Sequence, residues 1–180
     1  MIDYGNFVFA APPRTGSTWF IKAAAEAGLG KGFKAHVHSK APKDNTGLVV
    51  SLVRHPCPWL ASYYHVLQGG HTGVPEVDVL ETLARACPTF DGFVRGYLAN
   101  FEGHVTKIML SYQADSYIRT CDIRWGAYEL FVTAGVKAKT ALRATSHGPQ
   151  NCGKHSTDWN PSLWSAVEQS EPMIEQFEYD

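Results

Sequence analysis

An apolar run near the start of the chain passes through a short turn into a helix, and this succession constrains the fold most. Residues 6–11 (NFVFAA) are almost wholly apolar and end at two prolines, which is typical of a strand buried on both faces of a parallel sheet. Residues 17–28 begin with hydroxyl side chains, continue through alanines and end in glycine, which predicts a helix. We expect this strand to be the first of the chain and central in its sheet.

Further strands and helices alternate along the rest of the sequence. We predict strands at residues 33–37, 48–53 and 116–119. We predict helices at residues 59–68, 123–134 and 161–177, with two or three more between 75 and 112. Residues 144–160 are small and polar without periodicity, which indicates a long loop. This alternation predicts an α/β fold, an open and mostly parallel sheet flanked by helices, with ligands bound beyond the carboxyl ends of the strands.

Composition narrows the class of protein. A chain of 180 residues with 44% hydrophobic content suits a single domain over residues 1–180. Its formal charge of −1 provides no overall field for holding nucleic acid or an anionic membrane, so we expect neither as a partner. The first residues lack the basic segment of a signal peptide, and no apolar run approaches the ~18 residues of a membrane span, from which we expect a cytoplasmic protein. The 4 cysteines and 8 histidines show no metal-ligand spacing, so we expect no structural metal.

The turn between the first strand and the first helix, residues 12–19 (PPRTGSTW), has the composition of an anion site. Backbone N–H groups and the helix dipole favour negative charge at a helix N-terminus. Gly16 permits close approach of the backbone, Ser17 and Thr18 add hydroxyl donors, and Arg14 adds fixed positive charge. A Walker A loop would read G-x-x-x-x-G-K-[ST]; here alanine replaces its first glycine and serine its lysine, which removes the usual lysine contact to ATP phosphates. An ordinary strand-to-helix turn with a capping serine is the alternative.

This turn resembles the 5′-phosphosulfate-binding loop of sulfotransferases that use 3′-phosphoadenosine 5′-phosphosulfate (PAPS), whose pattern is roughly [KR]-[ST]-G-[ST]-[ST]-W. Residues 14–19 match that pattern at each position. The resemblance implies a P-loop type of sheet, with Arg14 next to the bridging oxygen. It also implies that Thr15, Gly16, Ser17 and Thr18 hold the 5′-phosphate and the sulfuryl group, and that Trp19 lies against the adenine. Arginine in this place can stabilise charge but cannot donate a proton at neutral pH.

A second motif follows the strand predicted at residues 48–53. Arg54 is followed by His55-Pro56 and, eight residues after the arginine, by Ser62 in the segment SYYH. The sulfotransferase family similarly has a strand ending in R-[ND]-P with a serine eight residues further on, and both side chains bind the 3′-phosphate of PAPS. An arginine at a strand end and a hydroxyl two turns into the next helix can converge on one phosphate. ATP has no 3′-phosphate, so a site of this kind implies PAPS; a solvated arginine beside a packed helix is the alternative.

The resemblance touches most of the chain, with departures. Residues 117–123 (YIRTCDI) are similar to the family's strand-ending h-R-Y-E-D-L segment, but Thr120 and Cys121 stand in place of tyrosine and glutamate. Residues 155–179 resemble its closing helix. In the family, a loop before that helix brings basic groups over the 3′-phosphate, and Lys154 is the candidate here.

Sulfuryl transfer needs a nucleophile in line with sulfur, a base for its proton, and positive charge near the leaving phosphate. Arg14 would stabilise the leaving group. Cytosolic sulfotransferases use a histidine between the two motifs as the base, and His36 and His38 occupy that region, of which we favour His36. A surface or structural histidine is the alternative for each, and Glu26 is a weaker candidate for the base.

The resemblance therefore implies transfer from PAPS to a hydroxyl or amine of a small-molecule or glycan acceptor, with 3′,5′-diphosphoadenosine (PAP) as the product and no metal. The sequence identifies neither the acceptor nor the oligomeric state. Two other functions stay open: a non-catalytic nucleotide-binding protein of the same fold, and an ATP-dependent phosphotransferase acting on small molecules.

Overall fold

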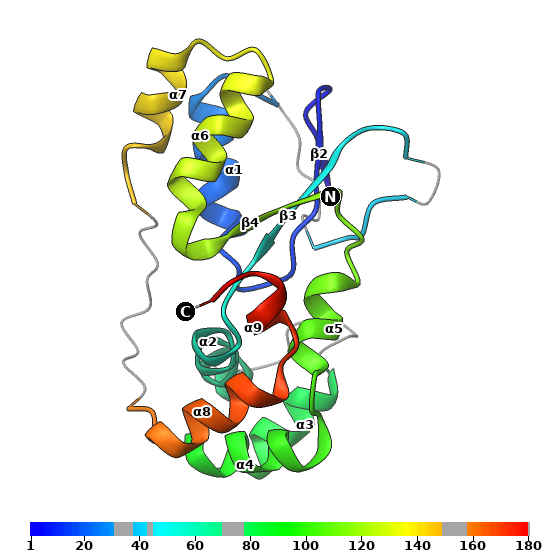
Figure 1. Ribbon diagram of the computed structural model, residues 1–180, viewed down its shortest axis with the longest axis vertical. Coiled ribbons are helices and arrows are strands. Elements are labelled where there is room, and N and C mark those ends of the chain that lie inside the picture. Colours follow the sequence, from blue (N-terminus) through cyan, green and yellow to red (C-terminus); the bar gives the residue numbers. More distant parts are fainter. Residues whose placement is uncertain (31–37, 43–44, 70–77, 149–157, 180) are drawn as a thin grey trace. The chain divides into compact units, whose positions relative to one another are not determined.

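A computed structural model describes residues 1–30, 38–42, 45–69, 78–148 and 158–179 of the chain (Figure 1). The chain forms two compact units, each built from two separate stretches of sequence. Unit 1 consists of Met1–Arg54 and Met109–Cys152, and unit 2 consists of His55–Ile108 and Gly153–Asp180. The expectation that residues 1–180 make up a single domain stays a prediction.

The described part of unit 1 contains a four-stranded sheet in the order β1-β2-β3-β4. Its strands are β1 (Ile2–Asp3), β2 (Val8–Phe9), β3 (Val49–Val53) and β4 (Ser116–Arg119). β2, β3 and β4 run parallel, whereas β1 pairs antiparallel with β2. The predicted α/β class is confirmed, but the sheet is mixed rather than mostly parallel. The reason is a tight N-terminal hairpin, in which the Tyr4 amide donates to the Phe7 carbonyl at 2.9 Å.

Helices α1 (Ser17–Glu26), α6 (Ile123–Thr133) and α7 (Ala138–Thr145) complete unit 1 with the 3-10 turn η2 (Thr120–Asp122). Phe20 of α1 joins the sheet to α6. Its ring stacks on that of Phe9, with the ring centroids 4.0 Å apart, and packs edge-on against Phe131, with the centroids 5.5 Å apart. All five residues of β3 are buried, and four of them are apolar, as is typical of a strand covered on both faces. This core holds the N-terminus of α1 and the carboxyl ends of β3 and β4 in one unit.

Unit 2 is helical in its described part. It contains α2 (Pro56–Gly69), α3 (Asp78–Ala86), α4 (Phe90–Asn100), α8 (Pro161–Ser170), α9 (Met173–Gln176) and most of α5 (His104–Leu110). Two helix starts follow common capping rules. The Thr89 hydroxyl accepts from the Gly92 amide at the start of α4, and the Asn160 side chain accepts from Ser162 at the start of α8.

A buried carboxylate joins α4 and α5 to the connection between α8 and α9. Glu171, only 1% exposed, lies between α8 and α9 and accepts hydrogen bonds from the Tyr97 hydroxyl of α4 and from Thr106 of α5. The Thr106 amide and hydroxyl lie 2.8 and 2.5 Å from its Oε2. Burial, together with the negative charge of Glu171, raises the pKa of Tyr97 above its ordinary value, so this hydroxyl stays a donor. The carboxylate is thereby supplied with the donors that a buried charge requires.

Several boundaries differ from the sequence predictions. The strand predicted at residues 6–11 is observed as Val8–Phe9 and is the second strand, because the short β1 precedes it. The helix predicted to begin at residue 59 begins at Pro56, since proline suits the first turn of a helix. The single closing helix predicted at residues 161–177 is divided into α8 and α9. The strand predicted at residues 33–37 lies outside the described residues.

Helix α7 was not predicted, and it takes the first two residues of the loop predicted at 144–160. Most of that loop lies outside the described residues. None of the helices in the described part of the chain has the length and apolar character that crossing a membrane requires.

Candidate functional site

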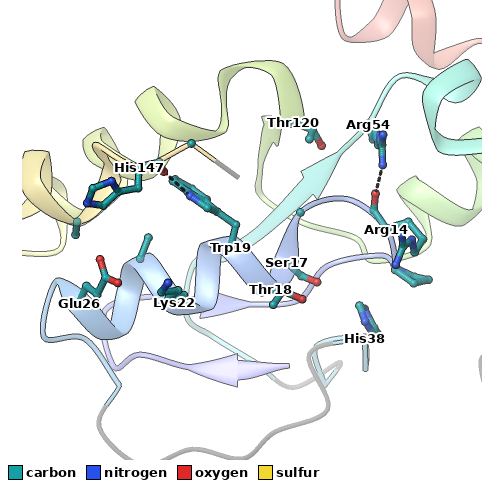
Figure 2. A pocket seen from close by; sticks show the side chains of 15 residues that line it. Arg14, Ser17, Thr18, Trp19, Lys22, Glu26, His38, Arg54, Thr120 and His147 are labelled. Atoms are coloured by element: carbon teal, nitrogen blue, oxygen red, sulfur yellow. Dashed lines mark hydrogen bonds between the residues drawn. The ribbon is translucent and has the colours of Figure 1, made fainter. Parts of the chain in front are cut away.

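A pocket of about 520 Å³ lies in unit 1 along helix α1 (Figure 2). Its described lining comes from the turn before α1, from α1 itself, from His38, from the residues directly after β3 and β4, and from the end of α7 with the residues that follow it. The volume falls within the range of pockets that bind small molecules and cofactors.

The turn between β2 and α1 has an unusual backbone. Arg14 has φ +66° and Gly16 has φ +93°, both in the left-handed region. A side chain on Gly16 would be crowded as well as strained, because its Cβ would lie 3.0 Å from Cδ1 of Ile123. The Thr15 hydroxyl is fully buried and donates to the Pro12 carbonyl at 2.6 Å, so it stabilises the turn from within and does not line the pocket.

Helix α1 presents its N-terminus to the pocket. Its first amides have no partner within the helix, and they carry the positive end of the helix dipole. Ser17 is buried and Thr18 is exposed, and both line the pocket. The first turn of α1 contains no acidic residue among its described positions, so no carboxylate of the helix competes with a bound anion there.

Cationic side chains line this pocket. Arg14 from the turn, Arg54 from directly after β3 and Lys22 of α1 line the pocket together with the carboxylate of Glu26. Arg54 donates from Nη1 to the Arg14 carbonyl at 2.9 Å, so it touches the turn itself (Figure 2). The structure thus brings together the arginines of the two sequence motifs, which are 40 residues apart.

His38 lines the same pocket near the turn (Figure 2). Its Nδ1 lies 2.9 Å from the Ala11 carbonyl, and because a carbonyl can only accept, Nδ1 carries the proton. In the neutral ring Nε2 is then the acceptor, as a general base requires. The Tyr112 hydroxyl donates to the His38 carbonyl at 2.8 Å and holds the residue in place. His36 lies outside the described residues.

The other end of the pocket joins α1 to the segment after α7. The Trp19 indole N–H donates to the His147 carbonyl at 2.6 Å, and Lys22 and Glu26 project from the same helix (Figure 2). Sequence reasoning named Trp19 and Glu26 but missed Lys22 and His147. Helical spacing could have revealed Lys22, because residues three and seven positions after Trp19 share its face. No local signal points to His147.

Thr15 and Ser62 are predicted site residues that do not belong to the described lining of this pocket. Ser62 lies on α2 in unit 2, whereas the described residues that line the pocket belong to unit 1. Lys154 lies outside the described residues. The predicted convergence of Ser62 and Lys154 with Arg54 on one phosphate therefore stays a prediction.

Within the residues that the structure describes, no group of three or more histidine, cysteine, aspartate or glutamate side chains is placed to hold a metal ion. No model of a protein family, no curated protein and no solved structure matches this chain. The function of the pocket must therefore be inferred from its own residues.

Proposed function

We propose that the chain binds PAPS in the pocket of unit 1 and transfers its sulfuryl group to a hydroxyl or amine of a small-molecule or glycan acceptor. One observation carries the proposal: the R-T-G-S-T-W turn at the N-terminus of α1 shares a pocket with Arg54, which follows β3. We also propose that β2, the turn and α1 form a sheet-to-helix unit of the P-loop type, in which the loop binds a phosphosulfate.

The charges of the pocket support a ligand with several negative groups. The described lining contains three cationic side chains, those of Arg14, Lys22 and Arg54, and the carboxylate of Glu26, and the N-terminus of α1 adds positive potential. Arg14 and Arg54 suit phosphate and sulfate oxygens, because guanidinium groups donate in a planar fork. The turn lacks the lysine of a Walker A loop, which weighs against ATP as the substrate.

In this mechanism PAPS supplies an activated sulfuryl group, whose sulfur–oxygen bond to the 5′-phosphate breaks as a bond to the acceptor forms. Arg14 and the first amides of α1 stabilise the negative charge that gathers on the leaving phosphate. His38 takes the acceptor's proton at Nε2, while its Nδ1 proton stays bonded to the Ala11 carbonyl.

His38 suits the base better than Glu26 does. Glu26 lies nine residues after Ser17 along α1, so a rise of 1.5 Å per residue puts it about 14 Å from the helix start. A base must come within hydrogen-bond reach of the proton that it removes. His36, which the sequence favoured, remains an alternative to His38.

Ligand preference tests the proposal. We expect PAP to raise the unfolding temperature without added metal and AMP to raise it much less, because only PAP carries both phosphates. At one hundred times its Kd, PAP should add about 2.7 kcal/mol to the free energy of unfolding. Arg14→Ala should abolish most of this shift. Arg143→Ala, which removes an exposed arginine of α7 outside the pocket, should not.

Labelled PAPS then tests catalysis with a panel of phenols, alcohols, amines and glycans as acceptors. Equal stabilisation by PAP and AMP, or an absolute requirement for Mg²⁺, would contradict the proposed ligand. Binding of PAP with no turnover across the panel would favour a non-catalytic nucleotide-binding protein.

A further inference from the structure

Thr120 connects the turn before α1 to the strand end that bears Arg54. It is the first residue of η2, directly after β4, and it lines the pocket. Its Oγ1 lies 3.0 Å from the Thr15 carbonyl and 2.8 Å from the Val53 carbonyl. Both partners can only accept, so the single hydroxyl hydrogen is shared between the turn and the end of β3.

Arg54 contacts the preceding carbonyl of the same turn. It donates to the Arg14 oxygen, so two successive carbonyls of the turn are held by side chains that follow β3 and β4. A trans peptide group is planar, and its C=O and N–H point in opposite directions. The two contacts therefore fix the directions of the Thr15 and Gly16 amides as well.

The turn requires such support. A left-handed φ costs an L-residue about 1–2 kcal/mol, and Arg14 adopts one at φ +66°. Conformations of this kind persist when the surrounding structure holds them. Thr120 also packs closely on the turn, since its Cγ2 would lie 3.8 Å from a Cβ on Gly16.

We infer that Thr120 is a positioning residue for anion binding. Its hydroxyl fixes the peptide between Thr15 and Gly16 and ties the turn to the strand end that carries Arg54. The inference rests on the proposed function for the identity of the anion, whereas the support of the turn rests on the hydrogen bonds alone. Thr120, which departs from the sulfotransferase-like pattern, thus holds the backbone of the turn in place through its hydroxyl.

Two substitutions separate the hydroxyl from the shape of the side chain. Thr120→Val keeps the shape and removes the hydroxyl, whereas Thr120→Ser keeps the hydroxyl. Thr145→Val is a control in the same unit, because the Thr145 hydroxyl also donates to a carbonyl, that of Ala141 at 3.1 Å, but Thr145 is buried and does not line the pocket.

The first readout is the pair of amide chemical shifts of Thr15 and Gly16 in the ligand-free protein, from ¹⁵N–¹H correlation spectra. We expect Thr120→Val to move both signals, Thr120→Ser to keep them near wild type, and Thr145→Val to leave them unchanged. The second readout is the Kd of PAP by calorimetry. Loss of one hydrogen bond worth about 0.5–1.5 kcal/mol predicts about two- to tenfold weaker binding for Thr120→Val and rescue by Thr120→Ser.

Amide signals that stay in place in Thr120→Val would overturn the inference, as would a serine variant that behaves like the valine variant. PAP binding that is the same in Thr120→Val and Thr145→Val would also overturn it. If the wild-type chain does not bind PAP, the proposed function fails, and the amide signals still decide whether Thr120 positions the turn.

Discussion

Replacing Gly16 by alanine tests whether the turn at the start of α1 depends on its backbone geometry. Gly16 is the N-cap residue of α1 with φ +93°. Gly135, after α6 in the same unit, has φ +90° and is a matched control, because a Cβ there would meet nothing within 4 Å. The two substitutions share the left-handed backbone and differ in their surroundings.

The expected free energies follow from that difference. Alanine in the left-handed region costs about 1–2 kcal/mol at either position. At Gly16 the new methyl group also lies 3.0 Å from Cδ1 of Ile123, and crowding of a packed site adds about 1 kcal/mol or more. We therefore expect Gly16→Ala to lower the free energy of unfolding by about 2–4 kcal/mol and Gly135→Ala by about 1–2 kcal/mol.

Urea unfolding measures these losses, and calorimetry with PAP measures their effect on binding. Loss of one charge-assisted hydrogen bond, worth about 1.5–3 kcal/mol, predicts at least about tenfold weaker PAP binding for Gly16→Ala. Gly135→Ala should bind PAP as the wild type does. Ile123→Val removes the crowding methyl, so the double variant should recover part of the additional loss. Equal losses in both glycine variants, with PAP binding intact and no recovery by Ile123→Val, would mean that the turn does not depend on a glycine at position 16.

Two further substitutions test the base and the core of unit 2. His38→Ala should reduce turnover of labelled PAPS by about 10²–10⁴ with PAP affinity near wild type, because the base acts on the acceptor; a near-normal rate would move attention to His36. Glu171→Ala should lower the free energy of unfolding, measured in urea, by about 3–5 kcal/mol, because the buried donors of Tyr97 and Thr106 lose their acceptor. Glu175 is exposed, so Glu175→Ala should change this free energy by about 0.5 kcal/mol or less. Similar losses of unfolding free energy in the two glutamate variants would mean that the hydrogen bonds to Glu171 add little to stability.

Elements with strong local signals could be predicted from the sequence. Helix α1 begins at Ser17, as the hydroxyl residues after Gly16 indicate, and β4 has the predicted bounds Ser116–Arg119. Strand β1 could not be predicted, because it has only two residues and exists through pairing with β2, where Ile2 lies opposite Phe9. Short elements of this kind depend on tertiary contacts rather than on periodicity.

Residues of the candidate site could likewise be predicted only where a local pattern marks them. The turn and Arg54 could be found because each belongs to a contiguous pattern at the end of a strand. The contact of Thr120 with Thr15 spans 105 residues, and that of Trp19 with the His147 carbonyl spans 128. No spacing along the chain encodes which distant carbonyl a hydroxyl or an indole will meet. The choice between His36 and His38 likewise depends on position in space, and only His38 is described.

The division of the chain into two interrupted units has a consequence for synthesis on the ribosome. The described residues that line the pocket belong to unit 1 and precede position 149, whereas the unit that begins at His55 also includes Gly153–Asp180. Tyr97 and Thr106 therefore emerge well before Glu171, the acceptor of their hydrogen bonds. Until Gly153–Asp180 is synthesised, the helices formed by His55–Ile108 cannot complete the core of unit 2. Apolar side chains such as Trp59, which is fully buried in the finished protein, stay open to other nascent chains and to chaperones during that interval.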